Sequence, residues 1–115
     1  MRAKITLLTV AAFLCLAATA FAHPPKVMDV SYDEQTSTLT INITHTTTNR
    51  TYHFINRIDI LVNGRLAEEK TFGSQTSNTM QTYVTRLKNV RSGDSIQVKA
   101  YCNRRGQKTA SITVE

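Results

Sequence analysis

Beyond its first two dozen residues, the chain is a succession of short segments in which apolar and polar residues alternate or β-branched residues gather. In residues 39–43 and 96–100 every second residue is apolar, which is the period of a strand that buries one face and exposes the other. No segment has a periodicity that favours a helix. The pattern predicts seven strands, at residues 27–32, 38–45, 54–62, 66–72, 80–87, 95–102 and 108–114.

Turn residues separate these segments. Asn63-Gly64 between two apolar runs is a strong hairpin signal, and Ser92-Gly93-Asp94 and Arg105-Gly106 mark two further reversals. The polar residues 73–79 are expected to cross between sheets. Seven short strands at this spacing predict an all-β protein, an immunoglobulin-like antiparallel β-sandwich of about seven strands. The chain has no Trp, so the cysteine and tryptophan core of antibody domains is excluded.

The first 22 residues have the features of a secretory signal peptide. Arg2 and Lys4 precede an apolar run at residues 5–16, and Ala20-Phe21-Ala22 resembles a small-residue cleavage site. We therefore expect residues 1–22 to be a leader and residues 23–115 to be one exported domain that begins at His23. The expected location is secreted or periplasmic, with no membrane attachment after cleavage.

Charge and composition narrow the function. Without Arg2 and Lys4 the 14 basic residues fall to 12 against 8 acidic ones, a net charge of about +4. These basic residues are scattered, so nucleic acid is not an expected partner. No catalytic triad or carboxylate pair is discernible, and glycine is too sparse for a phosphate-binding loop. No catalytic residue is therefore assigned.

The residues that could bind a metal are few, and they occupy similar positions relative to the predicted strands. Cys15 falls in the expected leader, so Cys102 has no partner for a disulfide within the mature chain, which is unusual for an exported protein. Cys102 and the histidines fall at strand ends or loop edges, where a sandwich can bring distant residues together. Imidazole with thiolate favours a transition metal such as iron, copper, zinc or nickel. The candidate ligands are His23, His45, His53 and Cys102.

Each candidate ligand also has an ordinary structural interpretation. Cys102 could be a buried, inert thiol, because free cysteine is among the most buried residue types. His45 could be an exposed bystander on a threonine-rich edge, and His53 a common loop histidine. His23 could be an accident of signal cleavage.

The local sequences around these residues resemble the iron domain of superoxide reductases, the desulfoferrodoxin and neelaredoxin family. The stretches that carry the resemblance run in the family's order along nearly the whole mature chain: His23-Pro24-Pro25, Thr44-His45, His53-Phe54-Ile55 and Cys102-Asn103 through Gly106. The family's fold is an immunoglobulin-like sandwich.

The resemblance implies a mononuclear, non-haem iron centre with four equatorial imidazoles and an axial thiolate, at which superoxide is reduced to hydrogen peroxide. It places His23, His45 and His53 among the equatorial ligands and Cys102 at the axial one, with an electron-donor protein as partner. Arg105 stands where the family has its fourth histidine, and arginine does not ligate because it keeps its proton. The family's Glu-Lys pair before its first histidine is also missing.

Copper is the second candidate metal. Cleavage after Ala22 would give His23 a free α-amine, which could chelate a metal together with its ring and supply the nitrogen absent at position 105. Such a donor set suits copper better than iron.

A second resemblance competes with the first. Residues 53–64, 91–94 and 109–114 are similar to the Z subunit of the thiosulfate-oxidising Sox carrier complex, which is also an immunoglobulin-like sandwich and binds no metal. It implies a non-catalytic interaction module that holds a cysteine-tailed partner subunit. The sequence thus predicts an exported metal protein of superoxide reductase type. It leaves open whether the protein is instead a carrier subunit or a copper protein, and whether it forms a homo-oligomer.

Overall fold

A computed structural model describes residues 27–115, which form seven antiparallel strands. Every predicted strand is present, and no boundary differs from the prediction by more than one residue. The part of the chain that the structure describes contains no helix, and so none that could cross a membrane. The strands are β1 (Val27–Asp33), β2 (Thr38–Thr44), β3 (Ile55–Val62), β4 (Arg65–Thr71), β5 (Met80–Arg86), β6 (Ser95–Cys102) and β7 (Gln107–Thr113).

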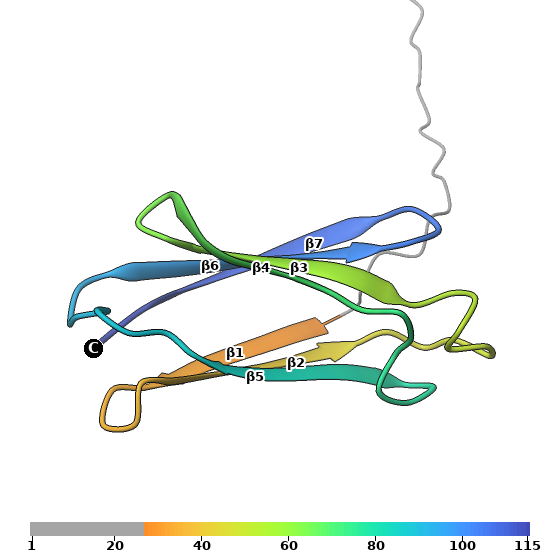
Figure 1. The fold of residues 1–115 in the computed structure, drawn as a ribbon, viewed down its shortest axis with the longest axis horizontal. Coiled ribbons are helices and arrows are strands. Elements are labelled where there is room, and N and C mark those ends of the chain that lie inside the picture. Colours follow the sequence, from red (N-terminus) through yellow and green to blue (C-terminus); the bar gives the residue numbers. More distant parts are fainter. Residues whose placement is uncertain (1–26) are drawn as a thin grey trace, which may run out of the picture.

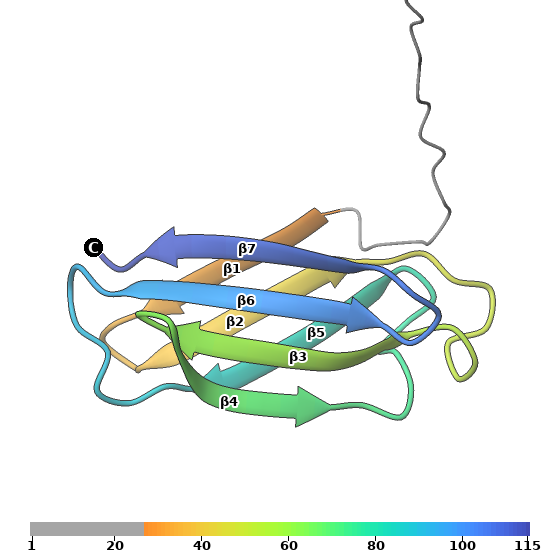
Figure 2. The same cartoon turned by 90° about the horizontal axis from the view of Figure 1, so that it is seen from above.

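The strands form two sheets that pack face to face (Figure 1). One sheet has the order β1-β2-β5 and the other the order β4-β3-β6-β7, and the strands of the two layers cross at an angle (Figure 2). Residues 72–79 carry the chain from β4 in one sheet to β5 in the other, as the polar composition of this segment predicts. This order is that of an immunoglobulin-like sandwich, so the predicted fold class is confirmed.

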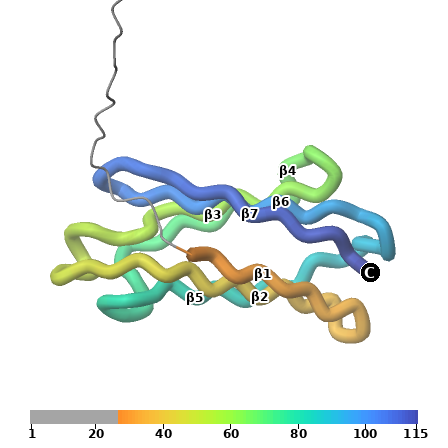
Figure 3. The backbone as a smooth tube through the Cα atoms, turned by 180° about the vertical axis from the view of Figure 1, so that it is seen from behind, coloured from red at the N-terminus to blue at the C-terminus, as the bar shows by residue number. Residues whose placement is uncertain are grey.

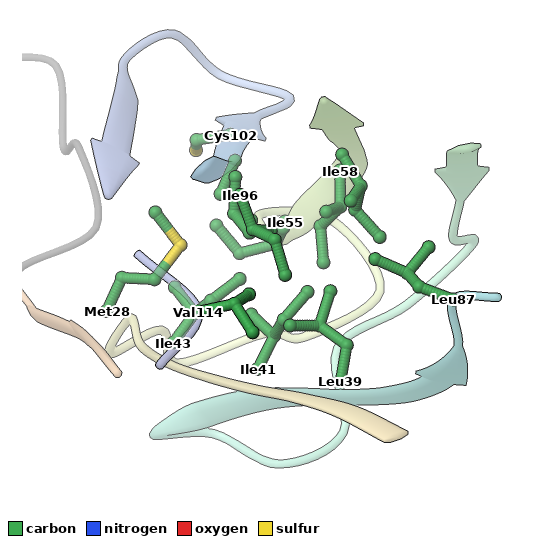
Figure 4. Close-up of a cluster of buried hydrophobic side chains, with 13 residues drawn as sticks. Met28, Leu39, Ile41, Ile43, Ile55, Ile58, Leu87, Ile96, Cys102 and Val114 are labelled. Atoms are coloured by element: carbon green, nitrogen blue, oxygen red, sulfur yellow. The ribbon is translucent and has the colours of Figure 1, made fainter. Parts of the chain in front are cut away.

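The core lies between the sheets and consists of the residues that alternate inward along each strand. In β2 the inward row is Leu39, Ile41 and Ile43, and all three are fully buried. In β6 the inward row begins with the buried Ile96 and Val98. Figure 4 shows Leu39, Ile41, Ile43 and Ile96 of this cluster together, with Cys102 at its margin.

The two long sides of the sandwich are closed differently. On one side β1 and β7 lie next to each other (Figure 3). On the other side Glu68 of β4 joins the sheets, because its carboxylate accepts hydrogen bonds from the Tyr83 hydroxyl and from Thr85 Oγ1, the latter at 2.9 Å. Partial burial and the bond to Glu68 raise the pKa of Tyr83, since both favour the neutral phenol.

The β3-β4 hairpin has the conformation that its sequence predicts. Asn63 and Gly64 both have positive φ, at 50° and 84°, as a two-residue type I′ turn requires. The Asn63 side chain also accepts a hydrogen bond from Ser95 N and donates one to Asp94. These contacts fix the end of the sandwich at which β3 ends and β6 begins.

Candidate metal centre

Three of the predicted ligands continue the inward rows of three strands at the opposite end of the sandwich. His45 lies two residues beyond Ile43 in β2, and His53 lies two residues before Ile55 in β3. Cys102 is the last inward residue of β6 and pairs with Ile55 across the sheet. Since alternate residues of a strand point to the same face, all three side chains are directed towards the end of the core.

The donor atoms of His45, His53 and Cys102 lie within 4.8 Å of one another. The two imidazole rings meet edge to face, with centroids 4.8 Å apart and planes at 84°. A nitrogen and a sulfur bound on opposite sides of one metal ion would be separated by about 4.4 Å, the sum of two ordinary bond lengths. Small side-chain movements would therefore let all three donors reach a single ion.

His45 is almost completely inaccessible, with 2% of its surface exposed. Its backbone N–H donates to Thr79 O at 3.0 Å, and its Nδ1 lies 2.8 Å from Gln75 Oε1. Its Nε2 is buried and has no hydrogen-bond partner among residues 27–115. Leaving a buried polar atom unsatisfied is costly, and a metal ion is one partner that would satisfy it. The residues present therefore fit a metal.

A tight turn before β3 sets the backbone of His53. The carbonyl of Asn49 accepts hydrogen bonds from Tyr52 N at 3.1 Å and from His53 N at 2.9 Å. The side-chain oxygen of Asn49 accepts two more, from the backbone N and the hydroxyl of Thr51. His53 is held in this way at the end of an ordered loop, and its side chain is less buried than that of His45.

Cys102 begins the turn between β6 and β7. Its Sγ accepts a hydrogen bond from Arg104 N at 3.4 Å, and its backbone N–H donates to Gly106 O at 2.9 Å. Arg104 also places its guanidinium 4.4 Å from the centre of the Tyr52 ring, which belongs to the His53 loop. These contacts hold the sulfur at the end of the core, and cysteine binds a metal through this atom.

The structure describes three of the four predicted ligands. His45, His53 and Cys102 are brought together, whereas His23 lies outside the described residues. The interpretation of His45 as an exposed bystander is wrong, because His45 ends a buried row. Arg105 is exposed and lies outside the cluster. Cys102 is buried and has no disulfide partner among residues 27–115.

Gln75, in the polar connection between β4 and β5, is a residue of the site that was not predicted from the sequence. Its side chain is 2% exposed and contacts the imidazole of His45. A single glutamine among serines and threonines gives no periodic signal, so nothing in the local sequence distinguishes it from a solvated loop residue.

The fold and the cluster define an immunoglobulin-like β-sandwich with two histidines and a cysteine that could hold a metal ion at one end of its core. No protein-family model and no curated protein matches the chain. Among solved structures, the chain is similar to the superoxide reductase (neelaredoxin) from Ignicoccus hospitalis, with 17% identity over 81% of each chain and a TM-score of 0.47. It is also similar to a superoxide reductase solved in the oxidized state, with 17% identity over 84% of this chain and 94% of that one and a TM-score of 0.49.

Proposed function

We propose that the protein is an exported transition-metal protein in which His45, His53 and Cys102 bind one ion. The observation that carries the proposal is the buried Nε2 of His45, which lacks a hydrogen-bond partner among residues 27–115 and belongs to a cluster with a second imidazole and a thiol. Imidazole and thiolate together select redox-active and borderline-soft metals over calcium or magnesium.

Iron is the metal that we propose first, because the sequence around these residues resembles an iron site. A redox ion at this position would supply single-electron chemistry towards a small molecule. The proposed reaction is the reduction of superoxide, in which superoxide takes one electron and two protons to give hydrogen peroxide. An electron-donor protein would supply the electron. Arg104 N–H, directed at Cys102 Sγ, would hold the thiolate in place during this transfer.

His23 is proposed as a further ligand. Val27, the first residue of β1, pairs with Thr44, the residue before His45. The chain therefore enters the sandwich at the end that contains the cluster. If the mature chain begins at His23, its α-amine and ring together would favour copper.

Spectroscopy of the mature protein tests the iron proposal. Iron-loaded, oxidised protein is expected to show a thiolate-to-metal charge-transfer band in the visible range, and Cys102→Ser should abolish it. His45→Ala and His53→Ala should each lower iron affinity, whereas Thr46→Ala, at an exposed position beside His45, should not. Catalysed loss of superoxide in the presence of a reductant then tests the reaction.

Two results would redirect the proposal. A protein that contains no metal when isolated from its native compartment, and that captures a cysteine-tailed partner, would favour the carrier-subunit alternative. Copper titration separates the two metals, because one extra residue before His23 should weaken copper binding only if the α-amine is a ligand. Equal copper affinity in the two forms would exclude the terminal chelate.

A further inference from the structure

Gln75 uses every hydrogen-bonding position of its side-chain amide at the metal centre. Its Nε2 lies 2.6 Å from His45 O and 2.9 Å from Ser77 O. Its Oε1 lies 2.8 Å from His45 Nδ1 and 3.2 Å from Ile55 N. The side chain is buried, so no water competes for these positions.

These neighbours determine which end of the amide is oxygen. Backbone carbonyls only accept hydrogen bonds, so the atom that faces His45 O and Ser77 O must be the NH₂ group. The backbone N–H of Ile55 only donates, so the atom that faces it must be the carbonyl oxygen. The opposite orientation would put oxygen against two carbonyls and the NH₂ group against the N–H of Ile55, so these three backbone groups would lose their hydrogen bonds to Gln75.

The orientation of Gln75 in turn fixes the proton of His45. An amide oxygen carries no hydrogen, so the hydrogen in the 2.8 Å contact must belong to Nδ1. A neutral imidazole with hydrogen on Nδ1 has its lone pair on Nε2, the buried atom for which residues 27–115 offer no partner. Metal-bound histidines commonly donate their other N–H to an oxygen in this way.

The same oxygen links the two histidines. Gln75 Oε1 accepts from Ile55 N, the first residue of β3, two residues after His53. Gln75 N also donates to Arg50 O, in the loop that leads to His53, at 3.0 Å. One side chain thereby connects the end of β2 in one sheet with the start of β3 in the other.

We infer that Gln75 is the positioning residue of this centre: it holds His45 in the Nδ1–H tautomer, presents Nε2 as the ligand atom, and fixes the spacing of His45 and His53. The effect of Gln75 on metal binding rests on the proposed function, because the tautomer decides which nitrogen of His45 can bind the ion. Loss of such a partner of a metal ligand typically lowers metal affinity by about 10- to 100-fold.

Nuclear magnetic resonance of the histidine side-chain nitrogens in metal-free protein tests the tautomer directly, with the signals of His45 assigned by a His45→Asn variant. Wild-type protein should show hydrogen on Nδ1 of His45. Gln75→Met should shift His45 towards Nε2–H and weaken cobalt(II) binding about 10- to 100-fold. Gln75→Glu places its second oxygen against His45 O and Ser77 O and should lower the free energy of unfolding. Its other oxygen still accepts from Nδ1 and Ile55 N, so His45 should keep the Nδ1–H tautomer.

Gln81→Met is the matched control. Gln81 is also a buried glutamine, at 3% exposure, but its amide bonds the backbone of Thr76 and Thr82 and not His45. It should lower the free energy of unfolding and leave both the tautomer and cobalt affinity unchanged.

The outcomes separate the two proposals. An Nε2–H tautomer in wild-type protein, or an unchanged tautomer and cobalt affinity in Gln75→Met, would overturn the role of Gln75. Wild-type protein that has the Nδ1–H tautomer but binds neither cobalt nor iron would overturn the proposed function and leave the positioning of His45 by Gln75 intact.

Discussion

Asn103, which follows β6, and Phe54, which precedes β3, form two hydrogen bonds with each other. These bonds lie at the metal-centre end of the four-stranded sheet. Asn103 N donates to Phe54 O at 3.0 Å, and Asn103 Oδ1 accepts from Phe54 N at 2.9 Å. The side-chain amide of Asn103 also donates to Tyr52 O at 2.9 Å. Since Phe54 follows His53 and Asn103 follows Cys102, these bonds set the spacing of two proposed ligands.

Removal of the Asn103 side chain should therefore affect stability and metal binding together. Asn103→Ala deletes two side-chain hydrogen bonds and should lower the free energy of unfolding by about 1–3 kcal/mol. It should also weaken cobalt binding, because the His53 loop is then free to move away from Cys102. Urea unfolding and cobalt titration measure the two effects.

Asn63→Ala is the control for this variant. Asn63 makes a comparable pair of side-chain bonds at the opposite end of the sandwich. Its positive φ adds strain to the alanine variant, so it should be destabilised at least as much as Asn103→Ala. Cobalt affinity that falls equally in both variants would mean that Asn103 acts through general stability alone.

Substitution of Ile41 tests whether the inward row of β2 is buried between the sheets. The side chain is fully buried, so Ile41→Ala should lower the free energy of unfolding by about 2–5 kcal/mol through lost burial and the cavity left behind. Val84→Ala is the comparison, because Val84 lies on β5 beside the neighbouring Thr40 and is 54% exposed. Its cost should stay within about 0.5 kcal/mol. Similar losses in both variants would argue against the observed register of β2.

Tyr83 should make stability depend on pH in the alkaline range. Its pKa is raised in the folded protein, so the folded state holds this proton more tightly than the unfolded state. The resulting stabilisation is fully present below the unfolded pKa of about 10 and is lost as the pH rises through the folded pKa. The difference in unfolding free energy between wild type and Tyr83→Phe should therefore shrink above about pH 10.

The comparison with Tyr83→Phe removes the contribution of the other tyrosines, which titrate in both proteins. A difference that stays constant or grows at alkaline pH would contradict the bond between Tyr83 and Glu68. Thr85→Val keeps that bond and removes a hydrogen bond that lowers the pKa of Tyr83, so the loss of stability at alkaline pH should be at least as large as in wild type.

Arg105→Gly should stabilise the protein. Arg105 has a φ of 119°, in the region that favours glycine, and its side chain is exposed. Replacement by glycine relieves the backbone and should raise the free energy of unfolding by about 1 kcal/mol. Cobalt affinity should not change, because Arg105 lies outside the cluster. Loss of stability in this variant would show that the arginine side chain makes a compensating contact.

Alternation in the sequence predicts two of the strands, and β-branched runs between turn residues predict the others. Leu39 to Ile43 and Ile96 to Ala100 follow a strict period of two, and both segments form strands with the predicted face buried. The same parity, extended by one step to His45 and Cys102, already points both side chains inward. The part of the site that sequence could not supply is Gln75, because its role depends on a crossover that brings it beside residues 20 and 30 positions away.

Two residues of the cluster lie at the ends of strands that correspond to the disulfide-linked strands of antibody domains. Antibody domains fasten their two sheets with a disulfide between the second and sixth strands. Here His45 follows the second strand, Cys102 ends the sixth, and the two strands belong to different sheets. A metal ion held by these residues would act as a reversible cross-link between the layers. Folding and metal supply would then be thermodynamically linked, and chelation would lower the melting temperature of the sandwich.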